Sequence, residues 1–316
     1  QETSVEMGAY ELNATVCAPY EADLAGPGYL VSTVNPIDDF RQAVECANAD
    51  ADADSIELDQ DVNFVDADPS GNDAALPTIR NPLTIFGSGG TRTLARSGGP
   101  DFRLLNVADN AGVVALNNLT FTGGSQALGG ALLNENSDGT LLDNYAFDGN
   151  TASRAGGAIA NISPGNLALN VGSLTNNAST STNSSVYGGA LFNSGTASIL
   201  NSTFIDSNSA TSTNQSAYGG GIYNLGSLDL IDAITISNND ATSSNGGLGF
   251  GGGILNAGGD TSLVDMTIGS NNSATTAGGG LALLATASQA GSVTGGNVDI
   301  NGNVNTSYGA GVYVEG

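Results

Sequence analysis

The sequence contains no histidine, no tryptophan and no lysine. Without histidine or lysine, a Ser-His-Asp or Cys-His catalytic centre, a histidine-ligated metal and Schiff-base chemistry are all excluded. The six positive charges are arginines, against 31 acidic residues, and the formal net charge is −25. A chain with this charge is not expected to bind nucleic acid through its phosphates, or to be drawn to an anionic membrane surface.

The sequence also lacks any run of about 18 consecutive apolar residues, so we expect no transmembrane helix and no membrane insertion. It begins at Gln1 and carries no basic and apolar leader. This is typical of a mature protein whose signal peptide has been removed. We therefore expect a secreted protein that is extracellular or displayed at the cell surface.

Cysteine is scarce, with only Cys17 and Cys46 in the chain. They do not form a C-x-x-C motif, and no histidine accompanies them. In an exported chain this favours a single disulfide between Cys17 and Cys46 over a metal or redox site. Two buried free thiols are the alternative.

Glycine, by contrast, is abundant, and much of it recurs in a motif such as "GGALLN", "GGALFN" or "GGGIYN". Successive copies begin 27 to 32 residues apart. The first glycines of the copies are Gly129, Gly156, Gly188, Gly219, Gly251, Gly278 and Gly309. Self-similarity at this period is typical of a solenoid, in which each repeat forms one coil.

Asparagines recur at two positions of the same repeat. One set follows an apolar residue by three positions and comprises Asn150, Asn177, Asn208, Asn239, Asn271 and Asn303. The other closes the glycine motif and comprises Asn134, Asn161, Asn193, Asn224 and Asn256. Residues that occur on every coil are not expected to form an active site, so we interpret both sets as structural amide ladders.

Between these positions the chain has short alternating apolar runs, which predict strands rather than helices. The sequence thus predicts an all-β fold, a single-stranded right-handed parallel β-helix over residues 66–316, with clear repeats from residue 129. Residues 1–65 differ in composition and predict an N-terminal segment and cap. A short helix is expected at about 38–48, because Asp38 or Asp39 can serve as its N-cap.

The stretch "DDFRQAVECANADADADSIEL" resembles the CSLREA-type N-terminal motif of secreted bacterial and archaeal β-helix proteins. Arg41 and Ala43 match its Arg and Ala, while Phe40 and Gln42 stand for its Leu and Glu. The "GGA[IL]" and "FxxN" motifs are similar to the repeats of polymorphic outer-membrane proteins. These resemblances imply a displayed or secreted right-handed parallel β-helix of a class that mostly lacks known enzymatic activity.

Some parallel β-helices cleave polysaccharides, a reaction that requires acidic or basic side chains close to one another. Asp148 and Arg154 flank one loop, and Asp206 lies further along, with the coil that carries Leu174 to Asn177 between them. Ordinary surface charge is the interpretation that we favour for them.

A calcium site is a second candidate. "DADADSIELDQD" spaces Asp50, Asp52, Asp54 and Asp61 as in an EF-hand, but it lacks the glycine and final glutamate of that loop. A solvated acidic turn is favoured, with weak Ca²⁺ binding as the alternative. No other cofactor is expected.

Three longer loops rich in Ser, Thr and Asn each end on an aromatic residue: Tyr187, Tyr218 and Phe250. On consecutive coils they would form one polar face with an aromatic row at its base. The row is either a contact surface for a glycan or a neighbouring subunit, or a cover for the coil edge.

The final stretch "YGAGVYVEG" begins another coil. An uncovered coil can pair with another chain, so we expect either a longer protein or docking on a second copy. The leading hypothesis is a non-catalytic extracellular structural protein that self-assembles head to tail into a filament or surface layer. A carbohydrate-binding adhesin is the alternative, and a polysaccharide lyase or hydrolase a more distant one.

Overall fold

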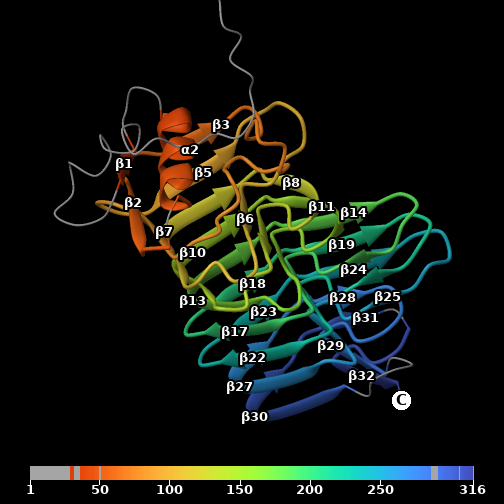
Figure 1. The fold of residues 1–316 in the computed structure, drawn as a ribbon. Helices are drawn as coiled ribbons and strands as arrows, with labels where there is room; N and C mark the ends of the chain where they lie inside the picture. The colour runs from red at the N-terminus through yellow and green to blue at the C-terminus, as the bar shows by residue number, and fades with distance from the viewer. Residues whose placement is uncertain (1–28, 32–35, 50, 286–290, 306, 316) are drawn as a thin grey trace, which may run out of the picture.

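The computed structural model is a parallel β-helix of about eight turns, with helix α2 (Pro36–Ala47) near its N-terminal end (Figure 1). The structure describes residues 29–31, 36–49, 51–285, 291–305 and 307–315. Strands pair in parallel with their counterparts one coil later and form three long sheets. The all-β parallel β-helix and the short N-terminal helix predicted from the sequence are thereby confirmed.

The first sheet has 14 strands. Its strands are β1 (Tyr29–Val31), β2 (Asp54–Leu58), β3 (Val62–Phe64), β4 (Leu83–Gly87), β5 (Arg92–Arg96), β7 (Val114–Thr122), β10 (Thr140–Asp148), β13 (Asn166–Thr175), β17 (Thr196–Leu200), β18 (Phe204–Asp206), β22 (Ser227–Ile231), β23 (Thr235–Ser237), β27 (Asp260–Ile268) and β30 (Ser292–Ile300).

The second sheet has 10 strands: β8 (Ser125–Leu128), β11 (Thr151–Ala155), β14 (Ala178–Ser181), β15 (Val186–Tyr187), β19 (Ser209–Ser212), β20 (Ala217–Tyr218), β24 (Asp240–Ser243), β25 (Gly249–Phe250), β28 (Ser273–Ala274) and β31 (Val304–Asn305). The third sheet has eight: β6 (Leu105–Val107), β9 (Leu132–Asn134), β12 (Ile159–Asn161), β16 (Leu191–Asn193), β21 (Ile222–Asn224), β26 (Ile254–Ala257), β29 (Leu281–Leu284) and β32 (Val312–Glu315).

The core consists of aliphatic side chains stacked from coil to coil. Because strand residues alternate between two faces, the same apolar positions point inward on every coil. In the first sheet one such column joins directly paired, buried residues: Leu142, Leu169, Ile199, Leu230 and Leu263. Burying each of these side chains contributes roughly 1.5–3 kcal/mol relative to leaving it exposed. A column of five such side chains therefore contributes substantially to the stability of the stacked coils.

The glycine motif forms the corner between the second and third sheets, and its two glycines have different roles. Gly188 has a φ of +65°, which side chains other than glycine rarely adopt. A Cβ on Gly189 would lie 2.0 Å from the carbonyl oxygen of Gly220 on the next coil. The first glycine therefore allows the turn, and the second allows the coils to approach each other.

Helix α2 covers the N-terminal end of the core. Phe40, Ala43 and Val44 are fully buried, and the ring of Phe40 lies 6.3 Å from that of Phe64. The helix begins at Pro36, two residues before the predicted start, so Asp38 and Asp39 lie in its first turn and not at the N-cap. Proline is favoured at this first position, and acidic residues in the first turn suit the helix dipole.

Strands β2 and β3 of the first sheet precede residue 66, where the change in composition places the predicted start of the β-helix. Strand β2 pairs in register with β4, and β3 pairs with β5, so both already belong to the first sheet. These first coils lack the glycine motif and could not be found by its spacing. Cys46 is buried in α2, but Cys17 lies outside the described residues, so their disulfide stays a prediction.

Candidate functional site

The first asparagine set forms a buried ladder in which each side-chain amide donates to the next coil. The Nδ2···Oδ1 distances are 3.0 Å from Asn150 to Asn177, 3.0 Å from Asn177 to Asn208, and 2.9 Å from Asn208 to Asn239. The ladder continues through Asn272, to which Asn239 donates at 2.9 Å, and not through Asn271. The sequence-based assignment of Asn271 to this ladder was wrong.

The shift arises because the turn after Ile268 has one more residue than the turn after Ile236. Asn272 is fully buried and donates to Asn303 at 2.8 Å. Asn271 is exposed, has a φ of +62°, and donates to Asn238 on the outside of the coil. Aligning the Asn-Asn pairs, in which the second residue is buried, would have identified Asn272.

The second asparagine set forms a parallel buried ladder at the end of the third-sheet strands. Asn134 donates to Asn161 at 2.7 Å, and Asn161 donates to Asn193 at 2.8 Å. The ladder continues from Asn193 to Asn224 at 2.8 Å and from Asn224 to Asn256 at 3.1 Å. In both sets the side-chain amides form hydrogen bonds with the neighbouring coils, so we assign them a structural role.

The three aromatic residues of the predicted contact face lie in one column. The rings of Tyr187 and Tyr218 stack with centroids 5.3 Å apart and planes 12° apart. Those of Tyr218 and Phe250 lie 6.2 Å and 3° apart. The stacked rings cover each other's faces, and Tyr218 has a ring on both sides. A ring in such a stack is poorly placed to lay its face against a sugar.

The structure adds a second aromatic column, from the third sheet, that sequence reasoning missed. Phe192 and Tyr223 stack at 5.7 Å, and Tyr223 lies 5.0 Å from Tyr187 and 6.2 Å from Tyr218. Burial, followed by the nearby hydroxyls of Tyr187 and Tyr218, raises the pKa of Tyr223. Together the two columns form a small apolar cluster outside the main core, which favours the interpretation that they cover the coil edge.

The Ser/Thr/Asn loops that precede Tyr187, Tyr218 and Phe250 are joined to one another by hydrogen bonds. Asn214 donates to Asn183, and Asn245 donates to Asn214, at 2.9 Å in each case, and all three side chains are exposed. The loops therefore form a regular polar surface whose outermost row is an amide ladder.

The acids considered for polysaccharide cleavage are used within the fold. The carboxylate of Asp148 accepts hydrogen bonds from Thr175 and Asn176, and Arg154 is exposed. The carboxylate of Asp206 accepts bonds from the side chains of Ser237 and Asn238, and these bonds lower its pKa although partial burial opposes them. Within the described ranges the two ion pairs are Arg41–Asp66 and Arg96–Asp101, so the structure does not bring Asp148 and Arg154 together.

The acidic run proposed as a calcium site is not folded as an EF-hand. Asp54 opens strand β2, and the extended chain of that strand separates it from Asp61. Asp61 accepts a hydrogen bond of 2.8 Å from the backbone N–H of Thr93. Asp50 lies outside the described residues, and among those described no group of three or more acidic, cysteine or histidine side chains is placed to hold a metal.

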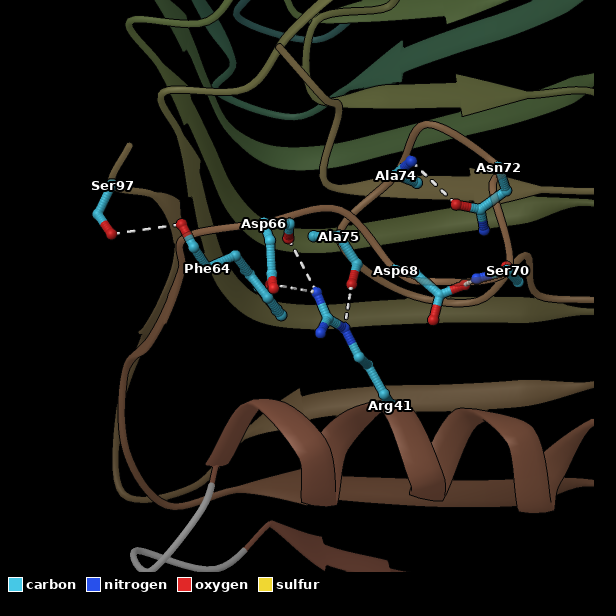
Figure 2. Close-up of polar contacts among 9 residues, drawn as sticks. All are labelled: Arg41, Phe64, Asp66, Asp68, Ser70, Asn72, Ala74, Ala75 and Ser97. Atoms are coloured by element: carbon cyan, nitrogen blue, oxygen red, sulfur yellow. Dashed lines mark hydrogen bonds and ion pairs between the residues drawn. The ribbon is translucent and has the colours of Figure 1, made fainter. Parts of the chain in front are cut away.

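The N-terminal cap holds a polar network that sequence reasoning did not foresee (Figure 2). Arg41 of α2 donates from Nε to the carbonyl oxygen of Ala75 at 2.9 Å and from Nη2 to that of Asp66 at 2.8 Å. It also forms an ion pair with the Asp66 carboxylate. Arg41, which matches the CSLREA-type motif, thus ties the helix to the loop between β3 and β4.

A cavity of about 600 Å³ adjoins this network, between the C-terminal half of α2 and the same loop. Its lining includes Glu45 of the helix and Arg80 of the loop. Burial, and then the charge of Asp68, raises the pKa of Glu45. Asp68 is itself buried and accepts hydrogen bonds from the backbone and hydroxyl of Ser70. The cavity thus brings a half-buried carboxylate and an exposed guanidinium to one lining, with a buried carboxylate near them.

No protein-family model, curated protein or solved structure matches the chain. The resemblances to the CSLREA-type motif and to polymorphic outer-membrane protein repeats therefore stay predictions from short motifs. In the described part of the chain, the helix present has 12 residues and is too short and too polar to cross a bilayer.

Proposed function

We propose that the chain is a non-catalytic structural β-helix, secreted and held outside the cell or at its surface. The observation that carries this proposal is that polar side chains pair from coil to coil on the outside as well as in the buried ladders. Asn170 donates to Asp143 at 2.6 Å, and Asn201 donates to Asn170 at 2.8 Å. Groups that could serve chemistry are used to keep the coils in register.

We further propose that copies associate head to tail. This is supported by the last described coil, where Val304, Tyr308, Val312 and Val314 are between 46% and 65% exposed. Val312 pairs with the buried Leu281, and β32 is the end strand of the third sheet. Within the described ranges no further strand is paired to β32, and an end strand with exposed apolar side chains is a template for another chain. A head-to-tail contact that does not close into a ring repeats and builds a filament.

The association is tested by sedimentation and electron microscopy of the purified protein over a wide concentration range. We expect mass to grow with concentration, and Val312→Asp to keep the protein monomeric. Val113→Asp, at an exposed valine before β7, is the matched control and should still associate. Strictly monomeric particles of the parent protein at high concentration would contradict the proposal.

A carbohydrate-binding adhesin is the second candidate, favoured by the exposed ladder of Asn183, Asn214 and Asn245. Regularly spaced amides can bond the hydroxyl groups of a repeating glycan. Binding on a glycan array that is lost in Tyr187→Ala and Tyr218→Ala would support this candidate. Because the two rings are stacked on each other, we expect these substitutions to have little effect on glycan binding. Turnover of an acidic polysaccharide that is lost in Asp148→Asn or Arg154→Ala would overturn the non-catalytic assignment.

A further inference from the structure

The cavity beside α2 has walls that are already held in place. Asn48 donates from Nδ2 to the carbonyl oxygen of Thr78 at 2.9 Å and accepts from the backbone N–H of Arg80 at 2.7 Å. Asn72 donates from Nδ2 to the carbonyl oxygen of Leu76 at 2.9 Å and accepts from the N–H of Ala74. Both amides are therefore occupied in shaping the loop and have little capacity left for a ligand.

Two charged groups on the cavity wall remain available. The carboxylate of Glu45 has no hydrogen-bond partner within the described residues, and the Arg80 guanidinium makes one long bond, 3.3 Å from Nη1 to the carbonyl oxygen of Thr78. A guanidinium has five N–H donors, so most of its capacity is unused. The two side chains line the same cavity, yet no ion pair joins them where the structure describes the chain.

The side of the cavity near Glu45 is negative. Asp68, at 3% exposure, lies behind Ser70 and contributes a second carboxylate. Two carboxylates close to each other and partly removed from water are destabilised unless a positive group lies near them. Arg80, an exposed residue, lines the same cavity and offers a positive charge. The cavity therefore presents opposite charges at two places.

We propose that this cavity binds a small zwitterion, with its ammonium group toward Glu45 and its carboxylate toward Arg80. Arginine binds carboxylates through two parallel hydrogen bonds, which favours a planar carboxylate there. Pro77 and Ala49 provide apolar contact for the rest of the ligand. The volume of about 600 Å³ lies within the range of small-molecule sites, roughly 300–1,000 Å³, and accommodates a free amino acid with its side chain.

The proposal is tested by isothermal titration of the full chain with single probes. These are α-amino acids with neutral side chains, γ-aminobutyrate, the matched amines, which lack a carboxylate, and the matched carboxylic acids, which lack an amine. We expect at least one zwitterion to bind about tenfold or more tightly than its amine and its acid. Glu45→Gln and Arg80→Gln should each weaken that binding about tenfold or more, while Arg154→Gln, at an exposed arginine in the coils, should not change it.

Circular dichroism spectra should show that the variants keep the fold, since both side chains lie at the cavity wall. Equal binding of a zwitterion to the parent and to both cavity variants would overturn the proposal. So would stronger binding of the amine or the acid alone, or no binding by any member of the panel. None of these results depends on whether the β-helix associates into filaments.

Discussion

Arg41 Nε donates a hydrogen bond of 2.9 Å to the carbonyl oxygen of Ala75, across 34 residues of sequence. The bond joins the capping helix to the loop that leads into β4. The Arg41 side chain is 11% exposed, whereas that of its ionic partner Asp66 is 63% exposed. An ion pair with so exposed a partner contributes little, so we assign the stabilising effect of Arg41 to its bonds with backbone carbonyls.

Arg41→Ala should lower the free energy of unfolding by about 1–3 kcal/mol, because it leaves the carbonyl groups of Ala75 and Asp66 without this donor. Arg41→Lys should recover only part of the loss, since a single ammonium cannot reproduce the guanidinium fork. Chemical denaturation measures both. Arg154→Ala is the control for removing a positive charge, and an equal loss there would refute the assignment.

Asn208→Ala should lower the free energy of unfolding by roughly 3 kcal/mol. The side chain accepts bonds from the amide and backbone N–H of Asn177 and donates to Asn239 and to the carbonyl oxygen of Leu174, all in a buried site. Leaving several buried groups unpaired costs about 1–3 kcal/mol each before relaxation. Asn214→Ala removes an exposed ladder member and should change stability by no more than about 0.5 kcal/mol. Similar losses at both positions would contradict the distinction between buried and exposed ladders.

Val171→Asn should stabilise the protein by about 1 kcal/mol. Val171 has a φ of +47°, a conformation that is strained for a β-branched residue and tolerated by asparagine. The equivalent position on the previous coil, between the pairs Asp143–Asn170 and Tyr145–Gly172, is Asn144, which has a φ of +50° and donates to Asn118 at 2.8 Å. The new asparagine would extend that exposed ladder. Val113→Asn exchanges the same residues outside this backbone region, so a thermal shift common to both variants would argue against relief of strain.

The stability of the protein should fall as the pH rises above about 10. Burial raises the pKa values of Tyr145 and Tyr223 from the ordinary value of 10.0. The unfolded chain therefore releases these protons at a lower pH than the folded chain, and each tyrosine lowers the free energy of unfolding by up to about 1.4 kcal/mol per pH unit. Tyr145→Phe should flatten this decline, as measured by denaturation between neutral and alkaline pH. An unchanged slope in the variant would show that Tyr145 does not cause it.

If Cys17 and Cys46 form the predicted disulfide, digestion without reduction should yield one cross-linked pair of peptides. Mass spectrometry under non-reducing conditions detects it. Removal of a native disulfide from a small domain typically costs 2–5 kcal/mol, and a loss toward the lower end of that range is expected here, since the long core of the β-helix remains. Alkylation of both thiols without prior reduction would show that the bond is absent.

The sequence was sufficient to predict the coils because stacking requires the same residue types at the same place on every coil. Gly188 and Asn208 could be placed from spacing alone for this reason. Spacing fails where a turn changes length, as it does before Asn272. It also fails for the first coils, where β2 and β3 pair without the glycine motif.

The aromatic cluster and the cavity could not be predicted for a different reason. Alternation within a strand tells which side chains point outward, but not which of them meet across a corner, as Tyr187 and Tyr223 do. The cavity depends on the irregular loop between β3 and β4, whose path no repeat defines. Glu45 and Arg80 are far apart in sequence and are related only through that path.

Gly188 and Gly219 are the equivalent corner residues of two consecutive coils, and their spacing determines which changes in chain length the fold can accept. Residues 188–218 form one complete coil, with Tyr187 paired to Tyr218 and Tyr218 to Phe250. Removing that coil would set Tyr187 directly against Phe250 and leave every inward column continuous. A shorter deletion inside a strand would shift the pairs of that strand, whereas the turns already differ in length from coil to coil while the strands after them stay paired. The fold is therefore compatible with a change in length by whole coils, and a single added residue is accommodated in a turn such as the one before Asn272.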